Sequence, residues 1–559
     1  MTSPHAALRR ALGASLVGLL LLTACGDDDD GGSSGADDSA SEPAGSTPAG
    51  GSSVGTAAGS GEDARAGGRL TLAYANPPSC IDPHQLADAL TITVGRQFTD
   101  SLTFQDPETG EILPALAESW EISEDGTTYT FTLRDGVTFS DGTPVDAEAV
   151  VANVQDIVDL GAQSLIGSSY VMGLETIEAL DESTVRIVFA EPSAQFLQAT
   201  STATLGLLAP ATLEADLGAR CNGELIGSGP FVIEEYVNGE SITLTKRPDY
   251  DWAPAGIATH DGPAYLDSVT FQVIAEPSVR TGALQSGQVQ GVESVQPVDQ
   301  EPLAAAGYQI VARSNPGMVN VLIPNVERPA LAELPVRQAL QKAIDRQTII
   351  DTLWNDNYAP ATSVLAATTP YYADLSAALA YDPDGANALL DDAGWVRGSD
   401  GIRERDGQRL HLDILLGSGD FELLQQQFAQ IGVELGVRQI DPADYVESLN
   451  RGEYDLAPYN LTRPDPSVLT ALFSSTLQNV PHFPEGEGPL DEVLAELSAV
   501  SDPEARAEVA AEAQRRIVEE AYALPTTEQA QVYAFAPEVQ DVYVEASSRL
   551  YLHGTWLAD

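Results

Sequence analysis

The sequence predicts a mixed α/β protein with more than one β-sheet, folded into two or three domains. Helical and strand-like patterns alternate irregularly from about Arg69 to the C-terminus, and no internal repeat is found. This body has roughly 490 residues, which is more than a single hydrophobic core usually covers. A signal-like N-terminus and a low-complexity segment precede it.

The N-terminus, residues 1–24, is typical of a bacterial lipoprotein signal peptide. Arg9 and Arg10 precede the apolar run 11–22. As a helix this run would rise only about 18 Å, whereas a hydrocarbon core is about 30 Å thick, so we expect a signal that is removed. Small residues then lead to Cys25, as in the bacterial lipobox, where the cysteine sulfur receives a diacylglycerol. The alternative is an ordinary signal peptide with an accidental cysteine.

Residues 25–68 predict a disordered linker. The segment consists almost entirely of Gly, Ser, Ala, Thr, Pro and acidic residues, so it has almost nothing to bury. Behind a lipidated Cys25 it would tether the folded body to the outer face of the cytoplasmic membrane, in a periplasm or at the cell surface.

Charge excludes some partners. The formal net charge is −56, with 83 acidic residues against 27 basic ones. Nucleic acid is not expected as a partner, because phosphate binding needs basic patches. Anionic lipid would be repelled, so we expect membrane contact through the lipid anchor only. The sequence has no phosphate loop and no dinucleotide fingerprint, and we expect a monomer without a cofactor.

Cysteines and histidines give no support for a metal or catalytic site. Cys80 and Cys221 remain after the signal, and export would let them form a disulfide. The alternative is two free buried thiols, since bridging depends on the fold. Two cysteines cannot form a tetrahedral thiolate site, and the histidines are scattered without metal-ligand spacing. We therefore expect no resident metal and no catalytic residues.

Three segments predict strands. Residues 128–133 and 184–189 alternate apolar and polar residues, the pattern of a half-buried strand. The residues expected to face the core are Tyr129, Phe131 and Leu133 in the first segment, and Val185, Ile187 and Phe189 in the second. Residues 231–247 predict a hairpin that turns at Asn238-Gly239, a pair that tolerates positive φ.

Four segments predict helices. One spans 335–354, begins at Pro335 and would bury Val336, Leu340, Ala343, Ile344 and Leu353. A second is capped by Asp382 and stops at Gly394. Residues 421–441 predict a helix, a turn and a strand. The last helix, within 502–525, is expected to end at Pro525.

Several runs carry a family resemblance. The run "LPALAESWEISEDGTTYTFTLRDGVTFSDGTPVDAEAVVANV" (113–154) resembles the signature of family 5 extracellular solute-binding proteins, the peptide- and nickel-type receptors of ABC importers. Further similar runs follow in the family's order: "GSGPFVIEEYVNGESITLTKRPDYDW", "VRQALQKAIDR", "YDPDGANALLDDAGW", then "YDL" and "PDP" within 454–466. Together they cover the chain from Leu70 onward.

The resemblance implies a two-lobed fold like that of periplasmic binding proteins (type II, cluster C-like), with an extra subdomain on the first lobe. It places lobe I at 69–84, 191–312 and 528–559, the subdomain at 85–190 and lobe II at 313–527. Ligand would bind between the lobes, which close over it. Trp120, Tyr129 and Phe131 are expected in the core.

The resemblance also implies ligand-contacting positions in lobe II. Dipeptide-binding relatives hold the peptide amine with an aspartate and its carboxylate with an arginine. Here Thr462 stands at the first position, and Ser418 and Asp420 lie near the second, so both expected charges are missing. A shifted alignment, a longer peptide held by its backbone, or a non-peptide ligand would each account for this.

A predicted loop at 459–465 follows the strand-like "YDLAP" and supplies the remaining candidates. Pro464 and Pro466 restrict its backbone. The candidate ligand-binding residues are Tyr459 as a stacking face, Arg463 as a fork of donors, and Asn460, Thr462 and Asp465 beside them. The alternative is that Arg463 is a loop residue paired with Asp465.

The function expected from the sequence is a substrate-binding lipoprotein of an ABC importer. It would capture a peptide or peptide-like solute between two lobes and deliver it to the permease and ATPase subunits. The alternatives are a secreted, lipid-anchored hydrolase, a structural surface lipoprotein, or a receptor of the same fold for a nickel complex or an oligosaccharide. For nickel, His411 lies in a strand pattern and is expected to face solvent or core.

Overall fold

The computed structural model describes residues 64–85, 88–164, 166–254, 257, 260–416, 421–441, 444–477, 479–483 and 488–559. The predicted signal peptide, Cys25 and most of the predicted linker lie outside the described residues, as do Ser418 and Asp420. Within the described part of the chain, no helix has both the length and the apolar character needed to cross a bilayer.

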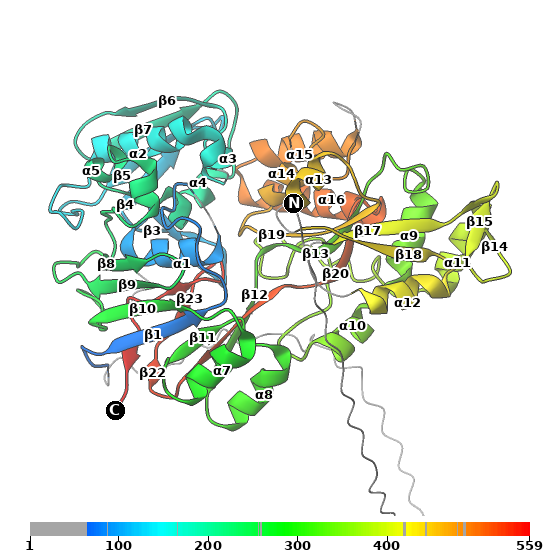
Figure 1. The fold of residues 1–559 in the computed structure, drawn as a ribbon. Coiled ribbons are helices and arrows are strands. Elements are labelled where there is room, and N and C mark those ends of the chain that lie inside the picture. The colour runs from blue at the N-terminus through cyan, green and yellow to red at the C-terminus, as the bar shows by residue number, and fades with distance from the viewer. Residues whose placement is uncertain are drawn as a thin grey trace, which may run out of the picture. The chain divides into compact units, whose positions relative to one another are not determined.

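The largest sheet has seven strands and joins both ends of the folded body (Figure 1). In spatial order the strands are β12 (Gln309–Ser314), β21 (Ala530–Phe535), β11 (Gly291–Glu293), β1 (Arg69–Tyr74), β10 (Ser268–Val273), β9 (Ser241–Lys246) and β8 (Phe231–Val237). β1 runs parallel to β10 and β11, and the other pairs are antiparallel. The helices α1 (Ala89–Phe98), α7 (Pro277–Gln285) and α8 (Pro297–Ala305) contact this sheet.

The predicted hairpin is part of this sheet. β8 and β9 pair antiparallel, and Gly239 between them has φ +77°, as its place in the turn requires.

A separate antiparallel sheet of four strands carries the segment with the family signature. Its order is β4 (Ala117–Ile122), β5 (Thr128–Leu133), β7 (Thr184–Phe189) and β6 (Leu174–Ala179), packed against α2 (Ala147–Leu160). The predicted alternation is confirmed, because every second residue of β5 and β7 is buried. Tyr129 and Phe131 are fully buried, and the partly exposed Trp120 packs against the same core. Asp146 caps α2 by accepting from the Ala149 amide at 2.9 Å.

The third sheet has five strands with helices on both faces. Its order is β18 (Glu434–Gln439), β17 (His411–Leu416), β19 (Leu456–Thr462), β13 (Gly317–Pro324) and β20 (Leu524–Thr527). Val321 and Ile323 of β13 pack with α14 (Ser467–Phe473), α15 (Pro489–Ala499) and α16 (Pro503–Glu519). Leu322 points to the opposite core, with α9 (Leu334–Ala343), α11 (Pro383–Asp392) and α12 (Glu422–Gln430).

Shorter elements complete the described chain. The strands are β2 (Thr103–Gln105), β3 (Ile112–Pro114), β14 (Val396–Arg397), β15 (Arg403–Arg405), β16 (Gln408–Arg409), β22 (Val539–Gln540), β23 (Tyr543–Val544), β24 (Leu550–Tyr551) and β25 (Trp556–Leu557). The helices are α3 (Gly167–Tyr170), α4 (Phe196–Ala199), α5 (Pro210–Leu213), α6 (Leu217–Cys221), α10 (Arg346–Leu353) and α13 (Tyr445–Asn450), with 3₁₀ turns η1 (Gly161–Gln163) and η2 (Ala203–Leu205).

Two chain segments connect the seven-stranded sheet with the five-stranded sheet. One leads from β12 to β13 and the other from β20 to β21. They are joined by a hydrogen bond in which the Asn315 amide donates to the Gln529 carbonyl at 2.7 Å. Two adjacent crossings of this kind form a narrow connection that can act as a hinge.

The prediction of one continuous helix over 335–354 is wrong. It is divided into α9 and α10, because Ile344 is extended and the Asp345 carboxylate caps a new helix by accepting from the Thr348 amide at 3.0 Å. Leu353, expected in the buried stripe, is 51% exposed.

The predicted end of the last helix is also wrong. α16 ends at Glu519, and Ala521 turns the chain with φ +48° before Pro525 enters β20. The other two helical predictions are confirmed: Asp382 caps α11, Gly394 follows it at φ +82°, and α12 leads through a turn to β18.

Cys80 and Cys221, the pair for which the sequence predicts a bridge, form a disulfide in the structure. A buried ion-pair network lies beside it. Arg220 binds Asp82 through Nε at 2.7 Å and Asp156 through both Nη atoms at 2.8 Å. Burial alone would raise the pKa of Asp156, but the hydrogen bonds from Arg220 and His84 outweigh it and lower that pKa to about 2.

Candidate functional site

A cavity of about 90 Å³ lies where three parts of the chain meet. One wall comes from the stretch around β2, from Tyr170 and from residues 198–204; a second comes from Thr462 and Pro464 at the end of β19; a third is 545–549, between β23 and β24. The enclosed space has room for several water molecules but is smaller than a peptide. A larger solute therefore requires the walls to move apart.

One hydrogen bond joins the first two walls of the cavity, and a second lies within the first wall. Gln105 donates from Nε2 to the Pro464 carbonyl at 3.1 Å, and its Oε1 accepts from Gln198 at 3.2 Å. Because Gln105 belongs to β2 and Pro464 follows β19, the first of these bonds connects the two walls of the cavity.

Arg96 and Glu545 form a buried ion pair at the cavity. The Arg96 Nε lies 2.8 Å from a Glu545 carboxylate oxygen, with an angle that is poor for a hydrogen bond, and both side chains are at most 6% exposed. The other guanidinium nitrogens of Arg96 donate to the Ser101 hydroxyl at 3.1 Å and the Ser201 carbonyl at 2.5 Å. Its charge is therefore compensated within the protein, and both of its Nη atoms donate there.

Arg549 is the second arginine that lines the cavity, and it is only half-buried. Its Nη1 donates to the Gln531 side-chain carbonyl at 3.3 Å and the Ser548 carbonyl at 3.5 Å, both long contacts. Across the described residues, no carboxylate lies within ion-pair distance of this guanidinium. Burial raises the pKa of the neighbouring Tyr533, so that hydroxyl stays neutral beside Arg549.

The predicted loop at 459–465 is largely strand. β19 continues through Thr462, and its pairing with β13 places Tyr459 opposite Val321 and Thr462 opposite Gly317. The alternating apolar side chains of this stretch complete the sheet, which is why the strand runs past "YDLAP". Thr462 is the candidate from this loop that lines the cavity.

Tyr459 and Asn460 do not line this cavity. Tyr459 is partly buried and packs against two hydrophobic clusters of the five-stranded sheet. Asn460 is exposed and donates from its amide to the Asn320 side chain at 3.0 Å. Both side chains therefore make contacts within the five-stranded sheet and its core in this structure.

Arg463 crosses from the end of β19 to α3. Its Nη2 donates to the Ser169 hydroxyl at 3.1 Å, and the guanidinium lies over the Tyr170 ring at 5.0 Å. Tyr170 lines the cavity, so Arg463 stands behind one of its walls.

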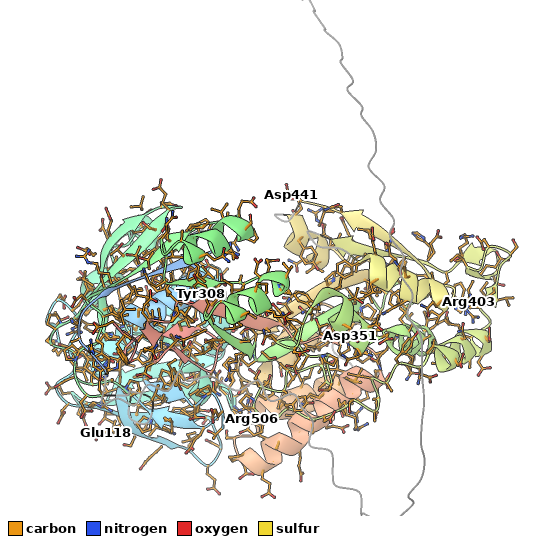
Figure 2. All side chains as sticks on the ribbon, turned by 90° about the horizontal axis from the view of Figure 1, so that it is seen from below. Glu118, Tyr308, Asp351, Arg403, Asp441 and Arg506 are labelled. Carbon is orange, nitrogen blue, oxygen red and sulfur yellow. A yellow bond between two sulfur atoms is a disulfide. The ribbon has the colours of Figure 1, made fainter. Side chains whose placement is uncertain are left out.

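The alternative interpretation, in which Arg463 is paired with Asp465, is wrong. Asp465 instead accepts from Arg506 Nη2 at 2.9 Å, and its other contact is the Ser467 amide at 2.8 Å. Arg506 belongs to α16 (Figure 2), a helix whose packing on the sheet brings this arginine to the strand end. Arg463 is close to Asp465 in the sequence, but in the folded protein Asp465 pairs with Arg506, which is 41 residues away.

The described residues offer no site for a metal ion. In the described residues, no group of three or more His, Cys, Asp or Glu side chains could hold a metal ion. His411 faces solvent from β17 and contacts Glu434 and Asp413, each at 3.1 Å. Burial lowers the pKa of His411, whereas its hydrogen bonds to these two carboxylates raise it, and the net effect is a rise.

The sequence reasoning missed Arg96, Glu545 and Arg549. A signal existed for Arg96, the single charge in the otherwise uncharged helix α1, "ALTITVGRQF". For Glu545 and Arg549 there was none, because only the fold brings the C-terminal segment to this helix.

Comparisons with known proteins decide the family. Residues 111–479 match the family described as "Bacterial extracellular solute-binding proteins, family 5 Middle". The chain belongs to this family. The resemblance noted in the sequence is therefore confirmed, and so is the two-lobed fold that it implied.

Individual members of family 5 agree with this assignment. The glutathione-binding protein GsiB of Escherichia coli (strain K12) is 28% identical over 374 residues, which cover 66% of this chain and 69% of that protein. The structure is similar to that of NikA from Brucella suis in complex with Fe(III)-EDTA, with a TM-score of 0.77, 25% identity, and coverage of 88% of this chain and 100% of that one. The ABC transporter substrate-binding protein CtaP of Listeria monocytogenes gives a TM-score of 0.75 at 26% identity, covering 89% of this chain and 100% of that one.

Proposed function

We propose that this chain is the substrate-binding lipoprotein of an ABC importer and captures a peptide or peptide-like solute in the cavity between its two lobes. The single observation that carries this proposal is the placement of the cavity. Its walls come from both sides of the two crossing segments, so a solute held there would be enclosed when the lobes approach and released when they part. The loaded protein would then be recognised by the permease.

We assign the lobes as the sequence suggested. Lobe I comprises 69–84, 191–312 and 528–559, its subdomain 85–190, and lobe II 313–527. Strand membership supports this division, since six of the seven strands of the largest sheet fall wholly in the lobe I ranges and all five of the third sheet fall in lobe II. The seventh strand, β12, begins in lobe I and ends two residues past its boundary at 312. The crossings at 315 and 529 then lie next to the proposed boundaries.

A peptide-like solute fits the chemistry of the cavity. Its lining combines the aromatic rings of Phe104 and Tyr170 with hydroxyl and amide side chains that can pair with a peptide backbone. Among the relatives, GsiB is named for glutathione, itself a small peptide. The lining contains no histidine or cysteine, so a soft metal ion would find no preferred ligand among these residues.

Stoichiometric binding without turnover tests this function. Trialanine is titrated into the mature protein by calorimetry, and the mixture is then followed by mass spectrometry. A receptor binds one molecule per chain, gains thermal stability as the solute exceeds Kd, and returns the tripeptide intact. Cleavage of the tripeptide would instead indicate the hydrolase alternative.

We also propose that Cys25 carries a diacylglycerol that anchors the protein to the outer face of the cytoplasmic membrane. The lipobox-like residues before Cys25 and the polar linker behind it support this proposal. A Cys25→Ser variant should lose the lipid and be released to the medium, or stay as an uncleaved precursor. A variant that still partitions with membranes and carries diacylglycerol would contradict it.

A further inference from the structure

The charges around the cavity do not balance. Three of the lining residues are charged: Arg96, Glu545 and Arg549. Arg96 and Glu545 compensate each other as an ion pair. One positive charge remains, in a chain that has 83 acidic and 27 basic residues. A cation facing an enclosed space favours an anion there, because screening by water is weak.

Arg549 has N–H donors that are not used within the protein. A guanidinium has five N–H donors, and Arg549 makes two long contacts from Nη1 and a hydrogen bond with the neighbouring Tyr533 hydroxyl. Arg96 differs, since each of its three nitrogens already faces an oxygen of the protein. The planar fork of Arg549 therefore matches a carboxylate of the solute.

The lining has no corresponding place for an ammonium group. Glu545 is the single carboxylate among the lining residues, and it pairs with Arg96 and accepts a hydrogen bond from the Ser547 hydroxyl. Apart from this carboxylate, whose charge Arg96 compensates, a charged amine would find only neutral oxygen atoms in the cavity. The two ends of a peptide should thus be recognised unequally.

We propose that Arg549 binds the carboxylate of the solute, and that the site is selective for the anionic end of a peptide while tolerating a blocked amine. This inference rests on the proposed peptide-binding function of the same cavity. It assigns carboxylate binding to a residue of the C-terminal segment, in the proposed lobe I. The family resemblance had placed this role in lobe II, near residues 418–420.

Three probes of equal length test the inference: trialanine, N-acetyl-trialanine and trialanine amide. Calorimetric titration of the mature wild-type protein should give Kd values within about threefold for the first two. The amide should bind about tenfold to a hundredfold more weakly, the scale of a charge-assisted hydrogen bond. Arg549→Met should weaken trialanine by a similar factor and leave the amide nearly unchanged.

Matched variants separate charge at the site from other effects. Arg438→Met removes an arginine that is exposed and paired with Glu453, outside the cavity, and should keep the wild-type preference. Arg549→Lys keeps the charge and should retain part of the preference for trialanine over its amide. It also serves if Arg549→Met fails to fold.

The outcomes distinguish two failures. Equal affinity for trialanine and its amide in the wild type, or a preference that survives Arg549→Met, overturns the role of Arg549 but leaves peptide binding intact. If Arg549→Met does not fold, Arg549→Lys decides the role of Arg549. That role is overturned if Arg549→Lys prefers trialanine over its amide as strongly as wild type, or if it shows no preference at all. No binding of any probe to the wild type overturns both this inference and the proposed function.

Discussion

Asp465 and Arg506 form a buried ion pair that joins the end of β19 to α16. The carboxylate oxygen and Nη2 are 2.9 Å apart, and both side chains are about 5% exposed. Arg506 also donates from Nη1 to the Ala194 carbonyl at 2.6 Å. In the lobe division proposed above, Ala194 belongs to lobe I, so one arginine supports the second wall of the cavity and contacts the opposite lobe.

Removal of Arg506 should destabilise the protein strongly. Arg506→Met leaves the Asp465 carboxylate buried without its partner, which typically costs about 3–5 kcal/mol. Arg515→Met on the same helix is the control, because Arg515 is 43% exposed and its ion pairs with Glu512 and Glu519 lie at the surface. Its cost should stay below about 1 kcal/mol. Urea unfolding measures both, and equal costs would contradict the assigned role of the buried pair.

Arg463 should affect binding through the closed form. It spans from β19 to Ser169 and Tyr170 without lining the cavity, so we regard it as a positioning residue. Arg463→Ala should weaken trialanine binding by about 1–2 kcal/mol, the sum expected for a cation–π contact and a hydrogen bond. Arg463→Lys keeps the charge but not the flat stack on Tyr170, and should recover part of the loss. Calorimetry that finds wild-type affinity in Arg463→Ala would rule this role out.

The disulfide should contribute measurably to stability. Cys80 and Cys221 are separated by 141 residues. In the chain-entropy account a loop of that size is worth up to about 5 kcal/mol, with less usually realised. The double variant Cys80→Ser/Cys221→Ser should therefore melt at a lower temperature than the wild type. Thiol titration of the unfolded, unreduced body is the check on the bond itself, and two reactive thiols there would contradict it.

Asp100 should make stability depend on pH between about 4 and 7. Burial raises its pKa to about 7, against the opposing effects of Trp252 and Arg96, whereas the unfolded chain has the model-peptide value of 3.8. The folded state thus binds the extra proton in this window. Its stabilisation is complete below about pH 4 and is lost as the pH rises through 7.

The variant Asp100→Asn isolates this effect, because an amide does not titrate. Relative to wild type, its free energy of unfolding should rise between pH 4 and 7, by on the order of 4 kcal/mol for a shift of this size. Urea unfolding at several pH values measures the difference. A difference that stays constant across the window would contradict the raised pKa.

The scaffold was predictable where local pattern decides structure. β5 and β7 followed from period-two alternation, and α11 from its Asp382 cap and Gly394 stop. The break between α9 and α10 was missed because the apolar stripe of α9 continues in the sequence, although Asp345 and Thr348 carry the capping pattern. At this point the Asp345 cap begins a new helix although the apolar pattern of the preceding helix continues.

The candidate site was predictable only in part. Thr462 was found because the resemblance fixes its position along the chain. Arg96 and Glu545 are separated by almost 450 residues and meet only because the C-terminal segment folds back and brings β24 beside α1. Pairing over such distances leaves no trace in periodicity or local charge pattern, and the same holds for Asp465 and Arg506.

The most direct test of the central claim is occupancy of the cavity, measured by native mass spectrometry on protein purified from its native host. Thr462→Trp fills the cavity, and Asn460→Trp, on the same strand but exposed and outside the lining, is the matched control. The account predicts one small solute per chain in the wild type and in Asn460→Trp, and none in Thr462→Trp. Equal occupancy in all three proteins, or no solute in any, would contradict it.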